Sequence, residues 1–78
     1  MSAQSLSNSE LLDEIRHRQQ NDSHFAEQLK RAVLGEIELY IRDLITKILE
    51  HQQIKWASSK IDQATSWVME QLKKLFRN

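Results

Sequence analysis

The 78-residue sequence contains no cysteine, no proline and a single glycine. Sheets and mixed α/β folds reverse the chain in tight turns that draw heavily on glycine and proline, so these counts predict an all-α protein. One glycine also excludes glycine-rich phosphate loops and the nucleophile elbow, which need at least two. The absence of cysteine excludes disulfides, thiolate zinc sites and a cysteine nucleophile.

Long apolar runs are also missing. Charged residues interrupt the most hydrophobic stretch, Ile37 to Leu49, which falls short of the roughly 18 apolar residues of a spanning helix. The first eight residues are polar and serine-rich, without the basic start and apolar core of a signal peptide. We therefore expect a cytoplasmic protein without a transmembrane helix.

The charge balance gives no excess of either sign. Eleven basic and eleven acidic residues leave a formal net charge of +0, so the chain lacks the basic excess of a dedicated nucleic-acid domain. Hydrophobic residues make up 40% of the chain, which is too many for a disordered protein. A folded domain of this size without disulfides has a small core, and we expect binding to a partner to contribute to its stability.

Capping signals and hydrophobic periodicity predict three helices. Ser7 and Glu10 have the spacing of a capping box, which predicts a short helix over about 8–18 after a disordered stretch at 1–6. The polar residues 19–23 predict a hinge. Apolar residues then recur every three or four positions, which predicts one long helix over about 23–50 in which Gly35 is tolerated. Ser59 resembles a second N-cap and predicts a third helix over about 59–77.

The connection near residues 50–59 has two interpretations. The chain either turns there or continues as a single helix of more than fifty residues, because the polar run contains neither glycine nor proline. The N-cap at Ser59 favours the turn. We therefore expect residues 7–78 to form a single small domain, with a short N-terminal helix and a long antiparallel helical hairpin.

The apolar face of the predicted central helix spans roughly 160°, which is wider than one partner helix covers. This width predicts self-association, with a dimer favoured, completing a bundle of four or more helices. The predicted self-association residues are Leu34, Ile37, Ile41, Leu44, Ile45 and Ile48.

Patterns for catalysis, metals and cofactors are weak. The three histidines never fall four residues apart on one helical face, and Glu14 with His17 supplies only half of a di-iron carboxylate pattern. Nothing in the sequence places a base beside any serine, and the clustered acids suit the first turns of a helix. We expect no enzymatic activity, no metal and no cofactor.

The C-terminal segment combines aromatic and basic residues, from which we predict the partner-binding residues Trp56, Trp67, Lys73, Lys74 and Phe76. A basic amphipathic helix of this kind binds an acidic groove on another protein or an anionic membrane surface. Alternatively, the aromatic side chains pack in the protein's own core. We expect a non-enzymatic protein-interaction module, such as an adaptor, chaperone or inhibitor, with peripheral membrane binding as the alternative.

Overall fold

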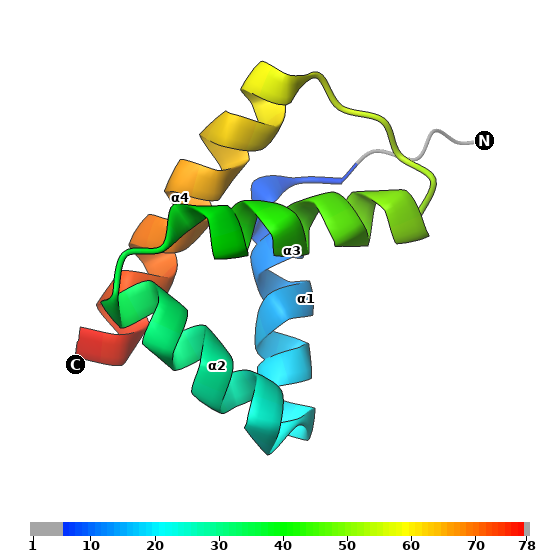
Figure 1. Ribbon diagram of the computed structural model, residues 1–78. Helices are drawn as coiled ribbons and strands as arrows, with labels where there is room; N and C mark the ends of the chain where they lie inside the picture. Colours follow the sequence, from blue (N-terminus) through cyan, green and yellow to red (C-terminus); the bar gives the residue numbers. More distant parts are fainter. Residues whose placement is uncertain (1–5, 78) are drawn as a thin grey trace.

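The computed structural model describes residues 6–77. Within that range the chain forms four helices and no strand: α1 (Asn8–Asn21), α2 (Ser23–Leu34), α3 (Glu38–His51) and α4 (Ser58–Arg77). Figure 1 shows α3 crossing α1 and α4, while α2 runs from the far end of α1 back toward the C-terminal end of α4. The predicted all-α class is confirmed.

Side-chain caps begin the first two helices. The backbone N–H of Glu10 donates to Ser7 Oγ at 3.2 Å, and the N–H of Ser7 donates to Glu10 Oε1 at 2.8 Å, so the predicted capping box is confirmed. The hinge expected over 19–23 shrinks to the single residue Asp22, whose carboxylate accepts the N–H of Phe25 at 3.0 Å and caps α2. The disorder predicted for 1–6 falls outside the described residues except at Leu6, which packs against the core.

The single helix predicted over 23–50 is wrong, because the chain leaves the helix at Gly35 and starts α3 at Glu38. Glu36 adopts a left-handed backbone with φ 58. The N–H of Ile37 donates to the carbonyl of Ala32 at 2.9 Å, and that of Glu36 to Val33 at 3.0 Å. These two bonds form a Schellman motif, which satisfies the last carbonyls of a helix. Gly35 is the helix C-cap rather than a tolerated interior residue.

The turn favoured near residue 50 is confirmed and repeats this motif. Gln53 has φ 60, and the N–H of Ile54 donates to the carbonyl of Leu49 at 2.9 Å. The chain then returns through an irregular segment and starts α4 at Ser58.

The long helical hairpin is also wrong, because α3 and α4 cross. Arg42, near the start of α3, donates from Nε to Asp62 at 2.7 Å and from Nη2 to Ser58 at 3.0 Å, both near the start of α4. A hairpin would place the end of α3 there instead. Apolar side chains from all four helices form one core: Leu11, Ile15, Phe25, Leu29, Val33, Ile41, Leu44, Ile45, Leu49, Ala64, Val68, Met69 and Leu72.

Replacing Gln53 by glycine is expected to stabilise the protein. A left-handed backbone costs an L-residue about 1–2 kcal/mol, whereas glycine adopts it freely and loses about 0.5–1 kcal/mol through the greater entropy of its unfolded chain. We expect Gln53→Gly to raise the free energy of unfolding by about 0.5–1 kcal/mol in urea denaturation. Gln52→Gly is the matched control, since Gln52 has φ −93, and it should give no gain. Equal effects of the two substitutions would contradict the prediction.

Candidate functional site

Three aliphatic side chains are exposed where α2 passes into α3. Leu34 is 49% exposed, Ile37 53% and Leu39 77%, and the only other exposed large apolar side chain in residues 6–77 is Leu75. Leu34 and Leu39 lie on the sides of their helices that face away from the buried residues of α2 and α3. We call Leu34, Ile37 and Leu39 the α2–α3 corner.

Two acidic residues flank the aliphatic side chains of the corner. Glu36 forms an ion pair with Lys73, whose Nζ lies 3.5 Å from Glu36 Oε1. This pair links the corner to the last turns of α4. Glu38 is exposed in the first turn of α3 and takes part in no ion pair among the described residues. The corner is therefore apolar with an acidic edge.

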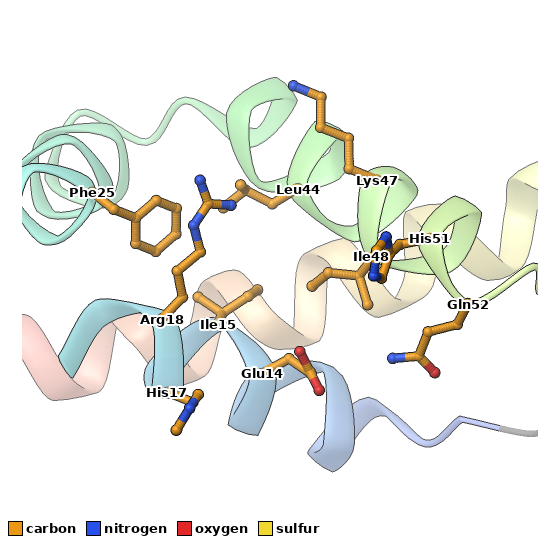
Figure 2. A pocket seen from close by; sticks show the side chains of 10 residues that line it. All are labelled: Glu14, Ile15, His17, Arg18, Phe25, Leu44, Lys47, Ile48, His51 and Gln52. Carbon is orange, nitrogen blue, oxygen red and sulfur yellow. The ribbon is translucent and has the colours of Figure 1, made fainter. Parts of the chain in front are cut away.

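A second surface feature is a groove between α1 and α3, with a volume of about 300 Å³. These are the least closely packed pair of helices. Figure 2 shows side chains from both helices directed into the space between them, with Phe25 of α2 at one end. The lining residues of this α1–α3 groove are Glu14, Ile15, His17, Arg18, Phe25, Leu44, Lys47, Ile48, His51 and Gln52.

The groove has an apolar floor and one unpaired guanidinium. Arg18 reaches across the groove so that Cζ lies 4.3 Å from the centre of the Phe25 ring. None of the ion pairs among residues 6–77 includes Arg18, so its donors are available to a carboxylate. Lys47, by contrast, points away from the groove in Figure 2 and pairs with Asp43 at 3.1 Å.

The predicted self-association residues divide into two groups. Ile41 and Ile45 are 0% exposed and Leu44 8%, and Ile48 packs against them. While the chain keeps this fold, Ile41, Leu44 and Ile45 face the chain's own helices rather than a second copy. The wide apolar arc is thus covered within one chain, and the prediction of self-association rests on Leu34 and Ile37, both in the corner.

The predicted partner-binding residues do not form one exposed surface. Trp56, Trp67 and Phe76 are half-buried and pack against the core, and Lys60 Nζ lies 4.3 Å from the centre of the Trp56 ring. Lys73 is engaged with Glu36, which leaves Lys74 exposed.

The membrane alternative meets an obstacle in α4. Val68 and Leu72, on the apolar face of α4, are 0% exposed, so α4 would have to leave the core before it could bind a membrane through that face. None of the four described helices combines the length and hydropathy that crossing a membrane requires.

Glu14 and His17, which resemble half of a di-iron pattern, both line the α1–α3 groove. In residues 6–77 no group of three histidine, aspartate or glutamate side chains is placed to hold a metal ion.

Leu39 and Arg18 are the residues that the sequence interpretation missed. Leu39 breaks the three- and four-residue spacing of the apolar face, and this out-of-phase position was the available signal. No sequence pattern singles out Arg18 as a groove residue, because Phe25 and Leu44, which line the groove with it, belong to other helices.

No family model, curated protein or solved structure matches this chain.

Proposed function

We propose that the protein is a non-enzymatic interaction module that binds another protein through the α2–α3 corner. The single observation that carries the proposal is the exposure of Leu34, Ile37 and Leu39, at 49%, 53% and 77%. An isolated exposed leucine is ordinary on a protein surface. Three large aliphatic side chains within six residues of sequence are typical of a docking surface.

The corner is also held in place before any partner binds. Backbone hydrogen bonds from Glu36 and Ile37 close the end of α2, and the Lys73 ion pair restrains the same segment from α4. A surface that is already ordered loses less conformational entropy on binding. This arrangement suits a convex recognition element that inserts its side chains into a hollow on the partner.

Leu39 should therefore be the residue most sensitive to substitution in partner binding. A photo-reactive amino acid at position 39 should cross-link to one defined protein, identified by mass spectrometry, when the full chain is added to an extract of its source cells. With that protein purified, Leu39→Glu should weaken binding at least about tenfold, because a carboxylate would be buried in an apolar contact.

Two controls separate a specific contact from general adhesion. A photo-reactive residue at Gln63, exposed on α4, should not give the same product. Leu75→Glu, at the 41% exposed leucine of α4, should change the affinity less than twofold. Equal cross-linking at positions 39 and 63, or unchanged affinity of Leu39→Glu, would refute the proposed docking surface.

A further inference from the structure

We infer that the α2–α3 corner of one copy docks in the α1–α3 groove of a second copy, joining the copies head to tail. This inference rests on the proposed function, since it names a second copy of the chain as one partner of the corner. It unites two features that the fold leaves uncovered: an apolar projection and an apolar hollow.

The shapes of the two surfaces are complementary. The groove volume of about 300 Å³ is roughly ten times the share of one water molecule in the liquid, so it has room for branched aliphatic side chains. Its floor consists of Ile15, Phe25, Leu44 and Ile48. Ile15, Phe25 and Leu44 are at most 8% exposed, so the half-buried Ile48 is the floor residue that would contact Leu39 and Ile37 of the other copy. Burial of Leu39 and Ile37, which are 77% and 53% exposed, favours the contact.

The charges are complementary as well. Beside its aliphatic side chains the corner carries Glu38, which takes part in no ion pair among the described residues, whereas Glu36 already pairs with Lys73. The groove presents the unpaired Arg18. A guanidinium stacked on an aromatic ring is held ready to bind a carboxylate, and such charge-assisted bonds are stronger than neutral ones. The one carboxylate of the groove, Glu14, lies a helical turn before Arg18, and this position orients the incoming acidic edge toward Arg18.

Two other arrangements fit less well. Corner against corner would bring the unpaired Glu38 carboxylates of the two copies together, and like charges repel. A chain cannot fill its own groove, because Leu39 is 77% exposed whereas Leu44, on the groove floor, is 8% exposed. These two residues therefore lie on different sides of the same rigid helix.

A head-to-tail contact has a distinct signature in solution. Each copy retains one free corner and one free groove after pairing, so association does not stop at a dimer unless a ring closes. We therefore expect a reversible increase in mass with concentration that continues beyond the dimer.

The test uses purified full-length chain in sedimentation equilibrium, from about 10 µM to about 1 mM. Wild type should gain mass with concentration, while Leu39→Glu, which lacks a functional corner, and Arg18→Glu, which lacks a functional groove, should each be monomeric. An equimolar mixture of the two variants should form a one-to-one dimer and nothing larger, because only one intact corner and one intact groove remain. Circular dichroism verifies that each variant keeps the helical fold.

Charge and exposure are matched by two control variants. Arg31→Glu removes an exposed arginine of α2 outside the groove, and Leu75→Glu alters an exposed leucine of α4. Both should associate as wild type does.

Three results would overturn the inference. A wild type that stays monomeric at about 1 mM would do so, and if cross-linking at position 39 to a different protein persists, the proposed function survives this failure. If Leu39→Glu fails to associate while Arg18→Glu still associates, the contact joins corner to corner. A mixture of the two variants that remains monomeric would show that corner and groove do not bind each other.

Discussion

Replacing Ile45 by alanine is expected to remove most of the free energy of unfolding. Ile45 is 0% exposed at the centre of the core, and truncating such a side chain costs about 2–5 kcal/mol through lost burial and the cavity left behind. A domain of this size without disulfides has only about 3–5 kcal/mol available. Urea denaturation followed by circular dichroism should show a transition shifted to very low denaturant, or none.

Leu39→Ala is the control for this experiment because it makes a comparable truncation on the same helix. Leu39 is 77% exposed, so its substitution should change the free energy of unfolding by less than about 0.5 kcal/mol. If the two variants were equally destabilised, α3 would not present the faces described. The pair therefore tests the orientation of α3, on which both the corner and the groove depend.

Enlarging Ala64 to leucine is expected to destabilise the protein by about 1–3 kcal/mol. Ala64 is 1% exposed and lies where α4 packs into the core. Close-packed interiors do not accommodate three extra carbon atoms without shifting their neighbours. For a chain of this length the melting temperature should fall by about 4–8 °C for each kcal/mol lost.

Ala57→Leu provides the comparison. Ala57 stands seven residues before Ala64 in the sequence, but it is exposed and precedes α4. Its enlargement should leave the melting temperature within about 2 °C of wild type. A large decrease for Ala57→Leu, or none for Ala64→Leu, would contradict the position of α4.

The start of α1 could be predicted from this sequence, whereas the corner could not, and Ser59, predicted as an N-cap, lies inside α4. Ser7 and Glu10 interact locally through hydrogen bonds that three-residue spacing alone reveals. At the corner, α2 and α3 both direct their apolar residues to one core, so the helical periodicity continues through the break. The left-handed positions at Glu36 and Gln53 are held by neither glycine nor asparagine, the usual signals. The remaining clue is the isoleucine that follows each of them.

The candidate surfaces were predictable only in part. Leu34 and Ile37 appeared in the sequence as contact residues for a second copy, as did Ile41, Leu44 and Ile45, which the fold buries. The prediction of self-association was drawn from the apolar width of the central segment. That width serves contacts with α1, α2 and α4, which are packing relations that a sequence does not display. From the sequence, the tryptophans either bind a partner or pack in the protein's own core. Their large rings cover the flank of the core, which is the second of these alternatives.

The junction at Asp22 makes the two ends of the α1–α3 groove unlike. Because a single residue separates α1 from α2, the Arg18 guanidinium of α1 is held 4.3 Å from the centre of the Phe25 ring of α2 at that end. No such short link joins α1 to α3 at the other end of the groove, beside Gln52. The covalent chain therefore restrains the groove most closely where a ligand would meet Arg18.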